Sequence, residues 1–160
     1  MKLNLKLLGF LSVAWVFFLL DRFFKFWIWD LESPLEIVSW GDFFVKVELY
    51  LNFDLALSLP FPRFLIVAVT LAILIILLGL GYKLLKKNDG YRVFFISLII
   101  LGAVSNLIDR IKDGYVTDYI NIGFSGYSFP VFNVADIMVS LGAVGLLFWL
   151  YKKGKTLKSS

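Results

Sequence analysis

Four long apolar segments constrain the fold of this chain more than any other feature. They cover residues 7–29, 64–82, 93–110 and 134–151, and each is close to the ~20 residues that an α-helix needs to cross the hydrocarbon core of a bilayer. The chain is 60% hydrophobic and its mean hydropathy is +0.85, well above ordinary globular usage. We therefore predict an integral membrane protein, mainly α-helical, with four transmembrane helices in a single membrane domain over residues 1–160.

The distribution of charge predicts the orientation of the helices. Basic residues gather at Lys2 and Lys6, between Lys83 and Arg92, and between Lys152 and Lys158, and Asp89 is the one acidic residue in these stretches. Because Lys and Arg are retained on the cytoplasmic side, we expect both termini in the cytoplasm and residues 30–63 and 111–133 outside it. The first apolar segment lacks a small-residue cleavage site, so we expect a retained helix and not a signal peptide. The net charge of +4 is then a topology signal, and no nucleic-acid partner is expected.

Both segments outside the cytoplasm contain strand patterns. Apolar side chains alternate from Val45 through Val47 and Leu49 to Leu51, which predicts one apolar strand face. Residues 116–122 are rich in β-branched and aromatic side chains and precede a Gly/Ser turn over residues 123–128. We therefore expect a small extracytoplasmic β-sheet beside the helices.

The absence of Cys and His narrows the chemistry. Without them the chain has no thiol nucleophile, no His general base and none of the usual zinc ligand sets. We expect no metal and no cofactor, so any chemistry would have to use carboxylates, hydroxyls, amides or the side chains of Lys and Arg.

Several polar residues within or beside the apolar segments need an explanation, because buried charge in a membrane is costly. Asp21 and Lys25 form an i, i+4 pair that is either a structural ion pair or part of a site. Asn106, Asp109 and Arg110 share one helix face, and the alternative for them is a helix end that returns to water.

Two further acids lie close to these groups in the chain. Asn133 and Asp136 begin the fourth segment, where Asn133 is suited to be an N-cap and Asp136 a favourable first-turn acid. Asp118 lies on the second predicted strand. Two carboxylates in one partly desolvated site do not both ionise easily, so Asp118 and Asp136 could act together as base and acid on a water molecule.

The polar residues fall into short motifs spread over nearly the whole chain. These are Asp21-x-x-x-Lys25, Asn52-x-x-x-Ala56, Asn106-x-x-Asp109-Arg110, Val116-x-Asp118-Tyr119 and Phe132-Asn133-Val134-Ala135-Asp136. In order and spacing they resemble the lipoprotein signal peptidases, the type II signal peptidases of bacterial inner membranes. One such motif is a weak signal, but several in the right order on four spans are specific.

The resemblance implies a four-helix bundle with a small β-cradle and a short helical arm. It implies an aspartic endopeptidase of the inner membrane that cleaves diacylglyceryl-modified prolipoproteins before the lipidated Cys, among membrane lipids and at the extracytoplasmic side. By position, Asp118 and Asp136 correspond to the catalytic dyad. The residues that would support the site or bind substrate are Asp21, Lys25, Asn52, Asn106, Asp109, Arg110 and Asn133.

The chain departs from the family pattern at a few positions. Arg22 stands where Gln is usual, Asp54 and Leu57 replace Gly and Phe, and Tyr119 stands where Phe is common. If Asp54 points into the site, its charge would perturb the titration of the dyad. The alternatives from other classes are an ion-coupled transporter, in which Asp21, Asp109 and Asp136 would relay protons, and an inactive scaffold.

Overall fold

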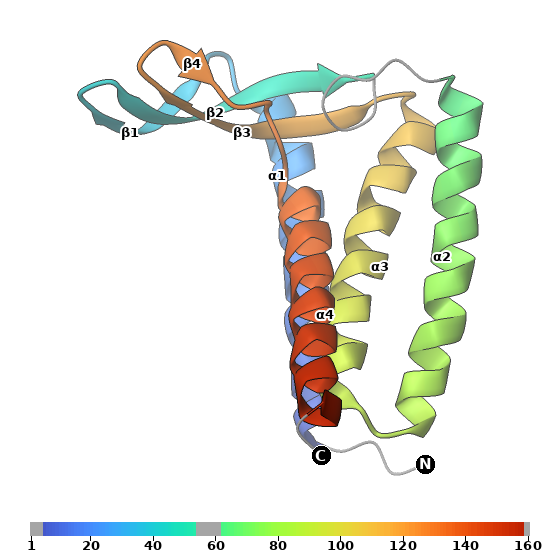
Figure 1. Ribbon diagram of the computed structural model, residues 1–160. Coiled ribbons are helices and arrows are strands. Elements are labelled where there is room, and N and C mark those ends of the chain that lie inside the picture. The colour runs from blue at the N-terminus through green and yellow to red at the C-terminus, as the bar shows by residue number, and fades with distance from the viewer. Residues whose placement is uncertain (1–4, 54–61, 159–160) are drawn as a thin grey trace.

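The computed structural model describes residues 5–53 and 62–158, which form a bundle of long helices with a β-sheet at one end (Figure 1). The elements in chain order are α1 (Leu5–Trp27), η1 (Ile28–Asp30), β1 (Leu35–Trp40), β2 (Phe43–Asn52), α2 (Arg63–Lys86), α3 (Gly90–Lys112), β3 (Val116–Phe124), β4 (Tyr127–Ser128) and α4 (Val134–Lys158). Four of the helices are long and apolar enough to cross a membrane. Their outward side chains are mostly apolar and exposed, as lipid contact requires.

Helix α3 lies at the centre of the bundle and packs against α1, α2 and α4. Small residues allow the closest of these contacts. A Cβ atom on Gly102 would lie 2.5 Å from the carbonyl oxygen of Ala135, and one on Gly142 would lie 2.6 Å from the carbonyl oxygen of Phe95. Such small residues let helix backbones approach each other in a membrane, where the hydrophobic effect does not hold helices together. The backbone of α3 therefore lies directly against that of α4.

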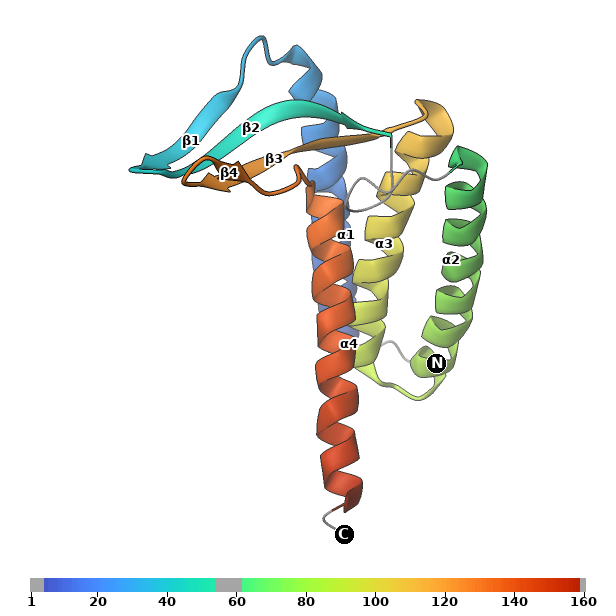
Figure 2. The same cartoon turned by 45° about the horizontal axis from the view of Figure 1, so that its top comes forward.

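The sheet is antiparallel, has four strands in the order β1-β2-β3-β4, and extends sideways from the end of the bundle (Figures 1 and 2). Strand β3 leaves the end of α3, crosses the bundle and leads through β4 to the start of α4. The prediction of four spanning helices with a small sheet is thus confirmed. The side of the membrane on which the sheet lies stays a prediction.

The strand pattern differs from the expected one within β2. The register with β3 shifts between Val47 and Tyr50, so the alternation that starts at Val45 does not continue through Leu49 and Leu51 on the same face. One extra residue at such a bulge moves all later side chains to the other face. The prediction of one continuous apolar face from Val45 to Leu51 is therefore wrong beyond the bulge.

The helical arm implied by the resemblance is not present between residues 31 and 53 or between 113 and 133. Residues 54–61 lie outside the described part of the chain, and they include Asp54, Ala56 and Leu57 of the second motif. The arm and the effect of Asp54 on the dyad stay predictions.

Candidate active site

The polar residues singled out in the sequence converge at the end of the bundle that carries the sheet. The last turns of α3, the first turn of α4 and the inner end of β3 meet there, and α1 and β2 supply further side chains. All nine predicted site residues take part: Asp21, Lys25, Asn52, Asn106, Asp109, Arg110, Asn133 and the acids Asp118 and Asp136.

Asp118 is a buried acid held between two amide donors. It is only 1% exposed, and its two carboxylate oxygens accept hydrogen bonds from Asn52 Nδ2 at 2.8 Å and Asn133 Nδ2 at 2.6 Å. Burial raises the pKa of Asp118 to about 7, and the nearby charge of Asp136 adds to the rise while the Asn52 hydrogen bond opposes it. Asp118 is therefore able to hold or release a proton near neutral pH.

Asp136 lies in the first turn of α4, within a reciprocal cap. Its backbone N–H donates to Asn133 Oδ1 at 2.9 Å, and the Asn133 N–H donates back to Asp136 Oδ2 at 3.2 Å. This is the capping-box arrangement, with the acid beside the positive end of the helix dipole. The other oxygen of Asp136 accepts a 2.8 Å hydrogen bond from Asn106 Nδ2.

Asn133 joins the two acids. It is fully buried, it caps α4 as the sequence suggested, and its Nδ2 also donates to Asp118. A single side chain therefore positions Asp136 through the helix cap and Asp118 through a direct hydrogen bond.

Lys25 connects α1 to this site. Its ammonium group contacts Asn106 Oδ1 at 2.7 Å, Asp109 Oδ2 at 2.7 Å and Asp21 Oδ2 at 3.1 Å. These partners match the three donors of a lysine. Asn106 accepts a hydrogen bond from Lys25 and donates one to Asp136. The Asp21–Lys25 pair therefore belongs to the same polar network as the two acids.

Arg110 contributes positive charge close to the acids. It is half-buried, and its guanidinium interacts electrostatically with Asp136, Asp118 and Asp109. A cation at this position favours the ionised form of the acids around it.

A family model described as signal peptidase (SPase) II matches residues 13–152. The chain belongs to this family. It is therefore a peptidase, and the alternatives of a transporter and an inactive scaffold lose their basis.

Individual relatives support the same assignment. The chain is 38% identical over 138 residues to the lipoprotein signal peptidase of Clostridium tetani, covering 84% of this chain and 87% of that one. It is 36% identical over 151 residues to the lipoprotein signal peptidase of Bartonella bacilliformis, covering 91% and 89%. A bacterial membrane enzyme solved by the in meso method at 2.3 Å resolution superposes with a TM-score of 0.78 at 26% identity, covering 92% of this chain and 90% of that one.

Arg22, a departure from the signal peptidase II pattern, joins the buried network. Its Nη1 lies 2.5 Å from Asp109 Oδ1 and also contacts Ser105. Arg22 and Lys25 supply two positive charges against the two negative charges of Asp21 and Asp109. Balanced charge of this kind is what allows ion pairs to remain buried.

Two hydroxyl residues of the network were not identified from the sequence. Tyr119, another departure from the family pattern, donates from its hydroxyl to Asp21 Oδ1 at 3.0 Å and accepts from the Val134 N–H at 3.1 Å. Ser105 donates to Asp21 Oδ2 at 2.6 Å. Ser105 had a detectable signal, because it lies four residues before Asp109 on the polar face of α3, whereas nothing in the sequence indicated the role of the Tyr119 hydroxyl.

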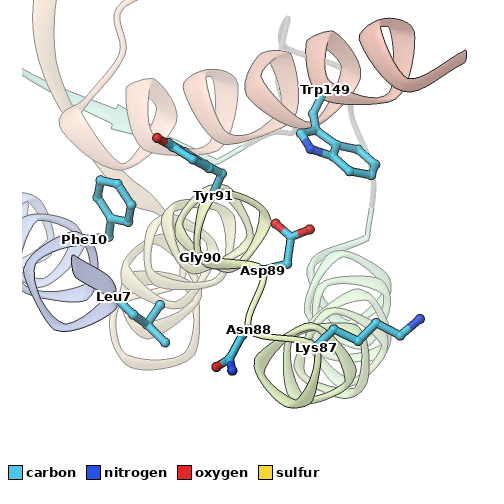
Figure 3. Close-up of a pocket in the computed structure, with 8 residues that line it drawn as sticks. All are labelled: Leu7, Phe10, Lys87, Asn88, Asp89, Gly90, Tyr91 and Trp149. Carbon is cyan, nitrogen blue, oxygen red and sulfur yellow. The ribbon is translucent and has the colours of Figure 1, made fainter. Parts of the chain in front are cut away.

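A cavity of about 420 Å³ lies at the opposite end of the bundle, where α1 begins and the α2–α3 connection passes α4 (Figure 3). Its lining includes Phe10, Asp89 and Trp149. Asp89 caps α3 and pairs with Arg92, whose guanidinium covers the Trp149 ring. This cavity therefore has a structural acid and is separate from the candidate active site. Within residues 5–53 and 62–158, no group of three or more acids is arranged to hold a metal ion.

Proposed function

We propose that this peptidase removes signal peptides from diacylglyceryl-modified prolipoproteins by cutting the bond before the lipidated Cys, with Asp118 and Asp136 as its catalytic pair. The names of the relatives support the substrate class. The observation that carries the assignment of the pair is Asn133, which touches both acids at the junction of β3 and α4.

Asp118 supplies the proton of the pair, since burial raises its pKa to about 7 and keeps part of it protonated at neutral pH. Asp136, in the first turn of α4, is the base of the pair in this proposal. It takes a proton from a water molecule while the water oxygen attacks the scissile carbonyl carbon, and Asp118 donates its proton to the carbonyl oxygen.

The tetrahedral intermediate then collapses. The C–N bond breaks, the leaving nitrogen takes the proton from Asp136, and the intermediate returns a proton to Asp118. The pair is left with one proton, as at the start, and water has been added across the peptide bond. Each acid therefore acts once as a proton donor and once as an acceptor.

The site lies on the extracytoplasmic side of the bacterial inner membrane in this proposal. The basic residues Lys83, Lys86, Lys87 and Arg92 lie at the end of the bundle away from the sheet, which supports a cytoplasmic location for that end. A site at the level of the helix ends also suits a substrate whose acyl chains stay in the bilayer.

A cleavage assay with paired substrates tests this function. A synthetic prolipoprotein peptide with a diacylglyceryl-modified Cys and its unlipidated counterpart are incubated with the enzyme in nanodiscs, and the products are sequenced by mass spectrometry. We expect cleavage only of the lipidated peptide, with the modified Cys as the new N-terminus. Equal cleavage of both peptides, or a cut elsewhere, would contradict the proposed specificity.

A further inference from the structure

The outer end of the sheet carries a row of aromatic side chains that crosses every strand. Trp40 of β1 pairs with Phe43 of β2, Phe43 pairs with Phe124 of β3, and Phe124 pairs with Tyr127 of β4. Directly opposed residues in antiparallel strands point to the same face of a sheet. These four residues, named here the aromatic row, therefore lie side by side on one face.

The aromatic row is largely uncovered. Trp40 is 85% exposed, Tyr127 84% and Phe124 62%. The next row on the same face is also apolar, with Val38 opposite Val45 and Val45 opposite Ile122. An exposed apolar patch of this kind marks an interaction surface, since soluble proteins rarely leave one open.

The other face of the outer sheet is polar. The Lys46 ammonium pairs with Glu36 at 3.6 Å and lies over the ring of Phe44, the aromatic residue of that face. Phe44 in turn covers Gly123, and Asn121 donates to Glu48 at 2.6 Å. The sheet is thus amphipathic, with one face suited to water and the other to an apolar surface.

The inner end of β3 contacts the bundle from both faces. Tyr119 bonds to Asp21 and to the Val134 N–H from one face, and Asp118 lies on the other. Side chains at alternate positions of a strand share a face, so Asp118 lies on the same side of β3 as Ile122 and Phe124. Asp118 contacts Asn133 at the start of α4. Farther out, the sheet projects beyond the helices (Figure 2), over the region that lipid around the bundle would occupy, and the apolar face is the one suited to that lipid.

The depth of the sheet also favours lipid. Strand β3 begins four residues after the end of α3, and α4 begins six residues after the end of β4. The sheet therefore lies level with the ends of the spanning helices, at the boundary between hydrocarbon and water. Trp and Tyr concentrate at this depth, because their rings are apolar and their N–H or O–H group needs a polar partner.

We propose that the aromatic row anchors the outer end of the sheet in the lipid headgroup region of the adjacent leaflet. The anchor holds the inner end of β3, and with it Asp118, at a fixed depth relative to the bilayer surface. This last consequence rests on the proposed function, but the anchoring does not.

The natural absence of cysteine permits a direct test with spin labels. Val38→Cys and Ser39→Cys are neighbouring, exposed positions of β1 on opposite faces, and neither replaces a member of the aromatic row. Each protein is labelled and placed in nanodiscs with one chain per disc, and collision rates with oxygen and with a water-soluble nickel chelate are measured. Leu147→Cys, on an exposed position of α4, is the lipid-facing reference.

We expect the label at position 38 to resemble that at position 147, with frequent oxygen and rare nickel collisions, and the label at position 39 to show frequent nickel collisions. Adding Trp40→Ser and Tyr127→Ser to the Val38→Cys protein should move its label toward the water pattern. Frequent nickel collisions at both positions would contradict the proposal. So would a label at position 38 that is shielded from both probes, which would indicate covering by protein.

A separate comparison addresses the depth of Asp118. The Trp40→Ser, Tyr127→Ser protein should cleave a lipidated peptide at the wild-type rate in detergent and more slowly in nanodiscs. If the variant instead cleaves at the wild-type rate in nanodiscs as well as in detergent, while the labels show lipid contact at position 38, the anchor stands and its effect on catalysis is overturned. If the wild type does not cleave the lipidated peptide in either medium, the result counts against the proposed function and not against the anchor.

Discussion

At the scale of single residues, the titration of Asp118 decides most of the chemistry. Its carboxyl is buried, it lies beside a second acid, and it accepts hydrogen bonds from Asn52 and Asn133. The burial and the neighbouring acid disfavour its charge, whereas the two amide donors favour it.

The pH dependence of cleavage should follow this balance. Activity should fall as the pH rises through about 7, because Asp118 then loses its proton. Asn52→Ala removes a hydrogen bond that lowers the pKa of Asp118, so the alkaline limb of the kcat profile should move to higher pH. A limb that stays in place or moves to lower pH in the variant would show that Asp118 is not the titrating group.

The stability of the protein should depend on the same carboxyl. Its pKa is about 7 in the folded chain and near 3.8 in a free residue, so the folded state binds more protons between these values and stability falls as the pH rises from about 4 to 7. Asp118→Asn has no carboxyl at this position, so its stability should not show this fall with rising pH. From pH 4 to pH 8 the stability of the variant relative to wild type should therefore rise by up to about 4 kcal/mol, since one pKa unit corresponds to about 1.36 kcal/mol. Thermal melts at pH 4 and pH 8 check this, and a gain that is equal at both pH values would contradict it.

The Tyr119 hydroxyl should matter for both stability and rate. Tyr119→Phe leaves the ring against Phe24 but removes the bonds to Asp21 and to the Val134 N–H. We expect a loss of about 1–3 kcal/mol, seen as a lower Tm, because buried partners are left unpaired, and a lower kcat with unchanged KM. Tyr91→Phe, at a 65% exposed side chain, is the control. Identical melting and kinetics of the two variants would show that the hydroxyl has no positioning role.

The sequence indicated the acids of the site but not the Tyr119 hydroxyl, and the difference has a physical reason. Carboxylates beside apolar spans are costly, which drew attention to Asp21, Asp109 and Asp136, and the family resemblance then favoured a site over a structural ion pair or a helix end in water. A tyrosine in a strand carries no such signal, because its ring is also suited to packing. The contact of Tyr119 with Asp21, 98 positions away in the chain, arises only when β3 crosses the bundle.

At the scale of elements, the contact between α3 and α4 sets the geometry of the site. Asn106 of α3 reaches Asp136 of α4 at 2.8 Å, and Gly102 lies one turn earlier against the Ala135 carbonyl. A side chain at position 102 would push the helices apart just below this hydrogen bond.

Two matched glycine substitutions test this contact. Gly102→Ala should destabilise the protein by about 1–3 kcal/mol through overpacking and should reduce cleavage. Gly79→Ala in α2, where the new Cβ would meet nothing within 4 Å beyond its chain neighbours and the helix's own backbone, should be neutral or slightly stabilising. Melting temperatures and cleavage rates of both variants give the answer, and equal effects would mean that the close approach of α3 and α4 is not required.

The elements themselves were predictable where one property dominates. A run of about 20 apolar residues has few alternatives to a spanning helix, so all four helices were expected. The bulge in β2 between Val47 and Tyr50 was not, because the alternating pattern continues through it and the shift depends on pairing with β3. Strand β1 has the composition of a strand, but its antiparallel pairing with β2 could not be predicted from that composition.

At the scale of the whole molecule, charge and architecture predict the same orientation. The basic cluster around the α2–α3 connection lies at one end of the bundle, and the sheet with the candidate active site lies at the other. With basic loops retained in the cytoplasm, the sheet should lie outside it.

Cysteine labelling in cells checks this orientation. Asp42→Cys lies in the turn between β1 and β2. It should react with a membrane-impermeant maleimide in cells whose outer membrane is permeabilised and whose inner membrane is intact. Lys87→Cys, after the end of α2, should react only once the inner membrane is permeabilised. The reverse pattern would invert the orientation of the chain.

The central claim is that Asp118 and Asp136 act as one catalytic pair, and cleavage of a lipidated prolipoprotein peptide by matched variants tests it most directly. Wild type, Asp118→Asn, Asp136→Asn and Lys86→Ala, a change at the far end of α2, are compared in nanodiscs with folding verified by thermal melts. We predict that each Asp variant is folded and loses cleavage, while Lys86→Ala retains the wild-type rate. Normal turnover by either folded Asp variant would contradict the account.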